Sequence, residues 1–174
     1  MEFDYVVVGA GSAGCAVANR LSQCGNYLVA LIEAGPSDNS PWIHVPVGYY
    51  RTMGNPKSDW CYETQSDKGI ANRSIPWPRG RVMGGSSSIN GLLYVRGQPQ
   101  DFDVWSQLGC TGWSWDGVLP YFKRSESWDG IDETGLRGKD GPLSVQSARL
   151  KRDIVDHWVN AAVAAGYQRN NDYN

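Results

Sequence analysis

Two short apolar runs, separated by a helical pattern, predict the first folding unit of the chain. Residues 3–8 read FDYVVV, and residues 27–32 read YLVALI, a continuously apolar run. Between them, apolar residues at positions 13, 16, 17 and 21 recur at helical spacing. Continuous apolarity is typical of parallel strands that are buried on both faces. The pattern therefore predicts a βαβ unit over residues 3–35 and an α/β fold class.

The stretch over residues 36–80 shows no periodic pattern. It is rich in proline and contains Trp42, Trp60 and Trp77. Prolines at this density exclude long helices, while tryptophans supply apolar area that orders and anchors a loop. An ordered, irregular segment of this size is typical of a functional element such as a lid. We expect a lid-like segment here.

Regular patterns return in the second half of the chain. Short helices are predicted at residues 101–107 and 116–124, and a strand at residues 141–146. An amphipathic helix is predicted at residues 150–165. Its apolar face consists of Leu150, Ile154, Trp158, Ala161 and Ala165.

Composition excludes several classes of protein. The 174 residues include 16 Lys and Arg against 18 Asp and Glu, a net charge of −2. Nucleic-acid binding is therefore not expected, because it depends on clustered basic residues. No apolar run approaches the roughly 20 residues of a membrane span. The first residues, Met1-Glu2-Phe3-Asp4, are acidic where a secretion signal would be basic, so none is expected.

The cysteines point to a reducing environment. Cys15, Cys24, Cys61 and Cys110 show no C-x-x-C spacing and are too few for a disulfide scaffold. With only His44 and His157 available, no zinc or other metal site is expected. We therefore expect reduced thiols and a cytoplasmic location.

Glycine is abundant, at 21 residues, and the first cluster carries a recognisable motif. Gly9, Gly11 and Gly14 form G-x-G-x-x-G between a predicted strand and a predicted helix. Such glycines allow a tight turn, let backbone N–H groups approach a pyrophosphate, and permit close packing of helix on strand. Glu33, which ends the second strand, lies where a carboxylate accepts hydrogen bonds from an adenosine ribose, and it disfavours NADP. A rival interpretation, a shifted G-x-S-x-G nucleophile elbow, has no histidine in a plausible triad position.

A second cluster reads RGRVMGGSSSINGLLYVRG at residues 79–97. Gly84, Gly85 and the three serines after them offer backbone N–H and hydroxyl donors, which suit a phosphate or a flat ring. Asn90 could bridge cofactor oxygens with its amide. A serine-rich loop without function is the alternative.

Taken in order, these motifs resemble the glucose–methanol–choline (GMC) oxidoreductase family. The resemblance rests on GAGSAG, Glu33-Ala34-Gly35, residues 79–97, DFDVW and GWSWDGVLPYFKRSE, and spans the whole chain. It is strongest toward bacterial choline dehydrogenase-like alcohol dehydrogenases and oxidases. The resemblance implies a Rossmann-like βαβ FAD-binding fold. It assigns residues 1–100 to the N-terminal part of an FAD-binding domain, and residues 101–174 to a helical connection and the start of a substrate-domain region.

The resemblance also implies a set of FAD-binding residues. The first motif would bind the pyrophosphate, Glu33 the ribose, and the residues after Ile89 the flavin end. Family members with covalent FAD carry a histidine where this chain has Ile89, so non-covalent FAD is expected. The implied cofactor-binding residues are Gly9, Gly11, Ser12, Ala13, Gly14, Glu33, Ala34, Arg79, Gly80, Val82, Gly84, Gly85, Asn90, Gly91, Leu92 and Leu93.

The family's catalytic histidine comes from a C-terminal segment that has no counterpart here. His44 is expected to have a structural or lid role, and His157 to be a half-buried helix residue, so no catalytic residue is assigned in this chain. The chain stops at Asp172-Tyr173-Asn174, which resembles an internal family motif. We expect a complementary C-terminal chain to complete the fold and supply the base for oxidation of a primary alcohol by hydride transfer to flavin N5.

Three other functions remain open at this stage. A hydroxynitrile-lyase-like enzyme on the same fold would bind FAD without reducing it. A non-catalytic subunit would use FAD structurally. An NAD dehydrogenase would leave the second glycine–serine cluster without a role.

Overall fold

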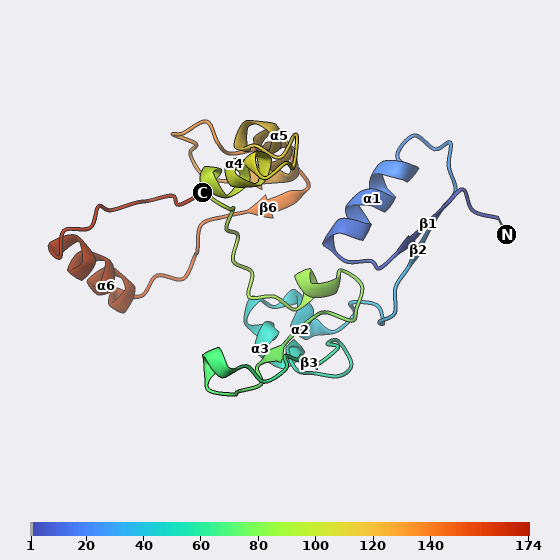
Figure 1. Ribbon diagram of the computed structural model, residues 1–174, viewed down its shortest axis with the longest axis horizontal. Coiled ribbons are helices and arrows are strands. Elements are labelled where there is room, and N and C mark those ends of the chain that lie inside the picture. The colour runs from blue at the N-terminus through green and yellow to red at the C-terminus, as the bar shows by residue number, and fades with distance from the viewer. Residues whose placement is uncertain (1) are drawn as a thin grey trace. The chain divides into compact units, whose positions relative to one another are not determined.

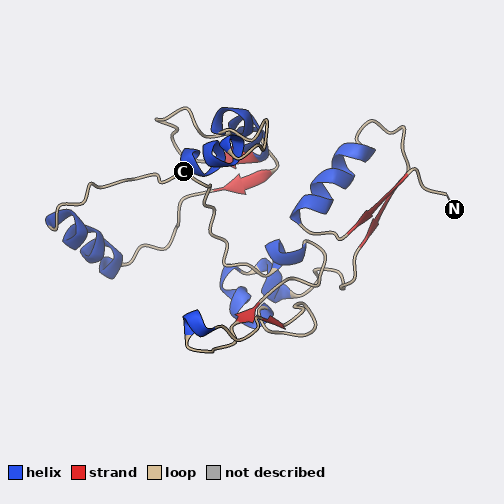
Figure 2. Cartoon of the chain, viewed as in Figure 1, coloured by secondary structure: helices blue, strands red, loops and turns tan. Residues whose placement is uncertain are grey.

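The computed structural model describes residues 2–174, which form two compact units. The first ends at Leu93 and the second comprises Tyr94–Asn174. Figure 1 labels the elements of each unit, and Figure 2 marks the helices and strands. The assignment of residues 1–100 and 101–174 to particular enzyme domains stays a prediction.

The first unit begins with the predicted βαβ arrangement. Strand β1 (Tyr5–Val8) leads into helix α1 (Ser12–Ser22), and strand β2 (Val29–Ile32) follows. The two strands pair in parallel, with Tyr5 opposite Val29 and Val8 opposite Ile32. The expected parallel pairing is thus confirmed.

Burial of these strands on both faces was expected of the complete sheet, and within the described residues, which contribute two strands to it, only one face is covered. Val7 is half-buried, on the face where Gly14 of α1 approaches it. Val6 and Val8 point to the opposite face and are 56% and 82% exposed. The reason is geometric: side chains alternate along a strand, so one helix covers only one face of a sheet.

The proline-rich stretch contains only short elements, as its composition predicts. Helices α2 and α3 have four residues each, and β3 and β4 form a two-residue antiparallel pair. The elements of this part of the first unit are α2 (Pro41–His44), η1 (Pro46–Gly48), α3 (Tyr49–Thr52), β3 (Tyr62–Glu63), η2 (Lys68–Ile70), β4 (Pro76–Trp77) and η3 (Gly85–Ser88).

The three tryptophans of this stretch, which were expected to anchor the loop through their apolar area, keep about half of their surface exposed. Each is instead covered by an arginine, whose cation is attracted to the ring face. The guanidinium carbon lies 5.6, 5.5 and 5.1 Å from the ring centroid. The pairs are Arg51 over Trp42, Arg81 over Trp60, and Arg79 over Trp77.

The second unit packs its two predicted short helices around an aromatic cluster. Phe102 is buried, and its ring lies 5.4, 5.7 and 5.6 Å from the rings of Trp105, Trp115 and Phe122. Strand β5, which follows α5 directly and was not predicted, pairs in parallel with β6. The elements are α4 (Pro99–Gln107), α5 (Trp115–Ser125), β5 (Glu126–Trp128), β6 (Leu143–Val145) and α6 (Asp153–Ala164).

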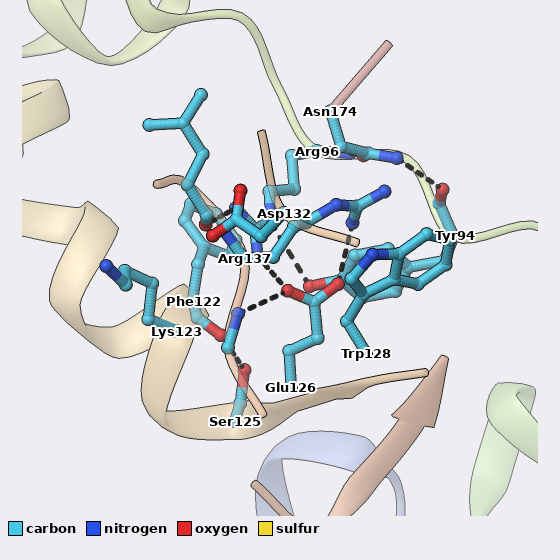
Figure 3. A network of polar contacts seen from close by, with 12 residues as sticks. Tyr94, Arg96, Phe122, Lys123, Ser125, Glu126, Trp128, Asp132, Arg137 and Asn174 are labelled. Atoms are coloured by element: carbon cyan, nitrogen blue, oxygen red, sulfur yellow. Dashed lines mark hydrogen bonds and ion pairs between the residues drawn. The ribbon is translucent and has the colours of Figure 1, made fainter. Parts of the chain in front are cut away.

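A buried ion network lies beside this cluster (Figure 3). The Glu126 side chain has no exposed surface and contacts Arg96 at 2.5 Å and Arg137 at 2.6 Å. Arg137 also binds Asp172 through two hydrogen bonds, at 2.7 and 2.9 Å. Two guanidinium groups thus face two carboxylates. We call Arg96, Glu126, Arg137 and Asp172 the ion network; no sequence pattern predicted it.

The last predicted helix forms, but its surroundings differ from the prediction. Helix α6 begins at Asp153, so Leu150 lies before it, and Ile154 and Trp158 are 70% and 72% exposed. His157 was expected to be half-buried and is exposed, because the described residues pack nothing on this side of α6. The four cysteines are free thiols. Among the described residues, no helix combines the length and apolarity that crossing a membrane requires.

Candidate functional site

The loop over residues 9–14, here called the glycine loop, connects β1 to α1 and presents free backbone donors. Gly9 donates its N–H to Ile32 O at 2.7 Å, which holds the loop at the end of β2. Gly11 caps α1 without any side-chain hydrogen bond. The N–H groups of Ser12, Ala13 and Gly14 therefore form the uncapped first turn of the helix, where an anion is stabilised.

Two glycines are required here by close approach. A Cβ at Gly14 would lie 1.9 Å from Gly9 O, so only glycine lets α1 begin this close to β1. A Cβ at Gly85 would lie 2.8 Å from Gly11 Cα, and Gly85 has a φ of +58°. The second glycine cluster therefore packs directly against the glycine loop, as a hydrogen bond of 2.8 Å from Gly84 N to Ala10 O also shows.

Glu33 closes the other side of the loop. Its Oε2 accepts the N–H of Ala10 at 2.8 Å, and its Oε1 accepts the N–H of Gly35 at 2.9 Å. A carboxylate has about four acceptor positions, so two remain for a ligand. Glu33 thus supports the loop itself, a role that the sequence did not indicate, and can still accept ribose hydroxyls.

The serine hydroxyls of the second cluster bond to nearby backbone, which corrects one expectation. Ser87 donates to Gly84 O, Ser88 donates to Met83 O, and Ser86 accepts the N–H of Gly80 at 3.1 Å. In short 3-10 turns such side-chain bonds to nearby backbone are favourable. The hydroxyls of Ser87 and Ser88 are therefore committed to their own loop and do not offer donors to a ligand.

The structure brings together some of the predicted residues and not others. Gly80, Val82, Gly84 and Gly85 lie with the glycine loop and Glu33 in the first unit. Ala34 is exposed just after Glu33, and the Arg79 guanidinium lies over Trp77. The flavin-end residues are exposed, and among the described residues none of their side chains bonds to the glycine loop. These are Asn90, Gly91, Leu92 and Leu93.

The sequence did not predict the long-range hydrogen bonds that hold the second glycine cluster in place. Met83 donates its N–H to Pro36 O at 2.9 Å, and Arg81 donates its N–H to Ser58 O at 2.8 Å. Asp59 is 2% exposed and accepts the N–H of Arg79. These partners lie about 20 or more residues away in sequence, and no local periodicity pairs such segments. The sequence itself shows only an aspartate before Trp60, and its burial is seen in the structure.

Neither histidine forms a catalytic arrangement. The Nε2 of His44 lies 2.7 Å from Asp38 O and 3.6 Å from the Asp38 carboxylate, on an exposed surface. His157 lies on the exposed α6. The described residues contain no group of three or more side chains that could hold a metal ion.

The geometry fits an anionic dinucleotide. The uncapped N–H groups of α1 offer donors to a pyrophosphate. The missing Cβ atoms of Gly11 and Gly85 leave room for a close approach, and Glu33 lies at the end of β2, where a ribose would reach it. Ile89, which directly precedes Asn90, is 2% exposed and carries no nucleophile.

Comparisons with known proteins agree with this geometry. Residues 3–174 match the GMC oxidoreductase family. An oxygen-dependent choline dehydrogenase of Photobacterium profundum is 45% identical over 174 residues, and the match covers 99% of this chain. A pyridoxine 4-oxidase from Mesorbium loti has a TM-score of 0.91 at 36% identity, covering 99% of this chain. An FAD-dependent oxidoreductase from Chaetomium thermophilum has a TM-score of 0.81 at 28% identity, covering 95% of this chain.

The chain spans only part of these proteins. It covers 30% of the Photobacterium enzyme's length, 34% of the pyridoxine 4-oxidase chain and 30% of the Chaetomium chain. The two folded units thus correspond to about a third of a complete enzyme.

Proposed function

Because this chain belongs to the GMC oxidoreductase family, whose members use FAD, we propose that it binds FAD for an alcohol oxidoreductase. The substrate is a primary alcohol and the product an aldehyde. One observation carries the proposal: the glycine loop, Glu33 and the second glycine cluster pack around the uncapped start of α1.

Each part of this site has a distinct task in binding. The N–H groups of Ser12, Ala13 and Gly14 hold the pyrophosphate, and the positive end of the α1 dipole stabilises its charge. Glu33 accepts the ribose hydroxyls through its remaining acceptor positions. The exposed segment Asn90–Leu93 would lie beside the flavin end. When bound, FAD supplies the flavin N5 that takes up the hydride of the alcohol.

The attachment of FAD is non-covalent in this proposal. Ile89 stands where covalent relatives have a histidine, and its aliphatic side chain is buried. FAD is thus retained without a covalent bond, and the hydrogen bonds and charge at the pyrophosphate and the ribose contribute to this retention.

Alcohol oxidation also needs a general base, because the hydroxyl proton must leave as the hydride is transferred. His44 bonds to Asp38 and His157 is exposed on α6, so neither lies in the cofactor site of the first unit. We propose that the complementary C-terminal portion of the family fold supplies this base. The active species is then this chain together with that portion, as one polypeptide or as two.

The test uses the protein purified with its complementary portion. A visible flavin spectrum is expected, and anaerobic addition of a primary alcohol should bleach it as the flavin is reduced. Choline is the first alcohol to try, and pyridoxine the second, because the relatives carry these names. A flavin that stays oxidised while a cyanohydrin is cleaved would favour a lyase, and a colourless protein would refute FAD binding.

A glycine variant serves as an internal check. Gly14→Ala places a Cβ 1.9 Å from Gly9 O and should displace the start of α1. The variant is expected to fold with little or no flavin. Retention of the full flavin content would show that the uncapped turn of α1 does not hold the cofactor.

A further inference from the structure

We propose that Asp59 is a positioning residue for FAD binding, because its buried carboxylate fixes the second glycine cluster against the glycine loop. The inference rests on the proposed function and adds to it a residue outside both motifs. Asp59 itself is not among the expected cofactor-binding residues; it acts through Arg79 and Gly80, which are.

The Asp59 carboxylate is the centre of a small backbone network. Its Oδ2 accepts the N–H of Gly54 at 2.7 Å, and its Oδ1 accepts the N–H groups of Cys61 and Arg79, both at 2.9 Å. Burial works to raise the pKa of Asp59, but these three donors and the Arg79 guanidinium outweigh it and hold the pKa below its ordinary value. The carboxylate is therefore charged, and each of its oxygens has a partner.

Asp59 also sits in a short antiparallel pairing with the start of the second cluster. Trp60 donates its N–H to Arg79 O at 2.9 Å, and Arg81 donates its N–H to Ser58 O at 2.8 Å. These two bonds flank a bridge that places Asp59 directly opposite Gly80. The side chain and the backbone of the same residue thus fix the position of Gly80.

From Gly80 the contacts lead to the cofactor loop in two steps. Gly80 donates its N–H to Ser86 Oγ, and a Cβ at Gly80 would lie 2.1 Å from Gly85 O. Gly85 in turn packs against Gly11, where its Cβ would lie 2.8 Å from the Gly11 Cα. A displacement of Gly80 therefore moves Gly85 away from, or into, the glycine loop.

The two carboxylate oxygens of Asp59 have different partners, which allows a positioning role in FAD binding to be distinguished from a purely structural one. Oδ2 serves only the turn at Gly54, whereas Oδ1 serves Cys61 and Arg79. Asparagine with its amide oxygen in the Oδ1 position keeps the two bonds on the Arg79 side and loses only the Gly54 bond. Alanine loses all three.

The experiment compares Asp59→Asn with Asp59→Ala in the flavin-loaded protein. Amide hydrogen exchange at Gly54 should accelerate in both variants, whereas exchange at Arg79 should accelerate only in Asp59→Ala. The FAD dissociation rate should change in parallel with hydrogen exchange at Arg79. It should stay near the wild-type rate in Asp59→Asn and rise by about tenfold or more in Asp59→Ala, the size expected when a hydrogen bond to a charged acceptor is lost. The visible circular dichroism of the flavin should change in the same variant only.

Two further variants make the result decisive. Asp132→Ala is the matched control, because Asp132 also accepts three backbone N–H groups, from Thr134, Gly135 and Arg137, but lies in the second unit. It should leave FAD dissociation unchanged. Ser86→Ala removes the acceptor of the Gly80 N–H from an exposed position. Ser86→Ala should accelerate FAD dissociation several-fold. If Asp59→Ala does not fold, the FAD dissociation rates of Ser86→Ala and Asp59→Asn test the inference in its place.

Three results would overturn the inference. These are equal flavin loss in Asp59→Asn and Asp59→Ala, wild-type retention in Asp59→Ala, and wild-type retention in Ser86→Ala when Asp59→Ala does not fold. A wild-type protein without flavin refutes the proposed function itself. A flavin-loaded wild type whose Asp59→Ala variant keeps its flavin refutes only the role of Asp59.

Discussion

Replacing Glu126 by glutamine exchanges one carboxylate oxygen for an NH₂ group at the centre of the ion network. Oε2 accepts from Arg96 at 2.5 Å and from Gly138 N at 2.9 Å, while Oε1 accepts from Arg137 at 2.6 Å. Glutamine keeps one acceptor oxygen, so its NH₂ group must face an arginine donor. The network then holds two guanidinium groups against a single carboxylate.

The cost follows from burial. The Glu126 side chain has no exposed surface, and the side chains of Arg96 and Arg137 are 2% and 3% exposed. Water therefore cannot compensate the unpaired charge. Breaking a buried ion pair by removing one partner costs about 3–5 kcal/mol, whereas a surface pair costs about 0–1 kcal/mol. We expect Glu126→Gln to fall in the first range.

Urea unfolding followed by tryptophan fluorescence measures this loss. Trp128 is a local reporter, because its ring lies 4.5 Å from the Arg137 guanidinium. Glu133→Gln is the matched control: it makes the same chemical change at an exposed position of the neighbouring loop. If Glu126→Gln destabilises the protein no more than Glu133→Gln does, the ion network does not stabilise the second unit and the reasoning is refuted.

Three further outcomes are expected. Burial works to raise the pKa of Asp172, but its bonds to Arg137 and Asn174 N outweigh this and lower the pKa. The stability that the ionised carboxylate contributes is complete above the ordinary aspartate pKa of about 3.9. It is lost as the pH falls through the lower pKa of the folded state. Asp172→Asn should therefore be less stable at neutral pH and lose less stability in this acid range, which unfolding free energies measured against pH will show; an unchanged acid profile would count against the pairing. Acid precipitation of the flavin-loaded protein should leave all flavin in the supernatant, and colour in the pellet would mean a covalent bond. Glu33→Gln leaves either Ala10 N or Gly35 N facing an amide NH₂ and should weaken FAD binding by about 1–3 kcal/mol. Equilibrium dialysis measures this loss, with Glu63→Gln as an exposed control on β3. Equal FAD retention in the two variants would show that Glu33 is not part of the site.

The sequence predicted those elements whose signal is local. The βαβ unit, α4, α5 and β6 follow from apolar spacing over a few residues, and the structure places them within a few residues of the expected bounds. Strand β5 was missed because it is three residues long and follows α5 without a turn. The residues that cover the second face of β1 and β2 could not be predicted, because a continuous apolar run indicates that a strand is covered but not which residues cover it.

The candidate site divides in the same way. Gly9, Gly11, Gly14 and Glu33 stand at fixed spacing, so the motif alone predicts them as binding residues, and that assignment stays a prediction. The bonds of the Ser87 and Ser88 hydroxyls to their own loop could not be predicted, since a serine donates equally well to nearby backbone and to a ligand. The role of Asp59 depends on the pairing of residues 58–60 with residues 79–81, which is a tertiary contact without a sequence period.

The contact between Asn174 and the start of the second unit has a kinetic consequence. Asn174 Oδ1 accepts the N–H of Arg96 at 2.7 Å, across a separation of 78 residues, and Asp172 reaches Arg137 across 35 residues. Contacts of such high sequence separation form late, because loop closure must be achieved before they contribute. The aromatic cluster of α4 and α5 should therefore assemble first, and the contacts of Asn174 with Arg96 and of Asp172 with Arg137 should form last. Limited proteolysis is then expected to cleave near residues 172–174 before it cleaves α4 or α5, and loss of Asp172 would leave Arg137 with Glu126 as its carboxylate partner.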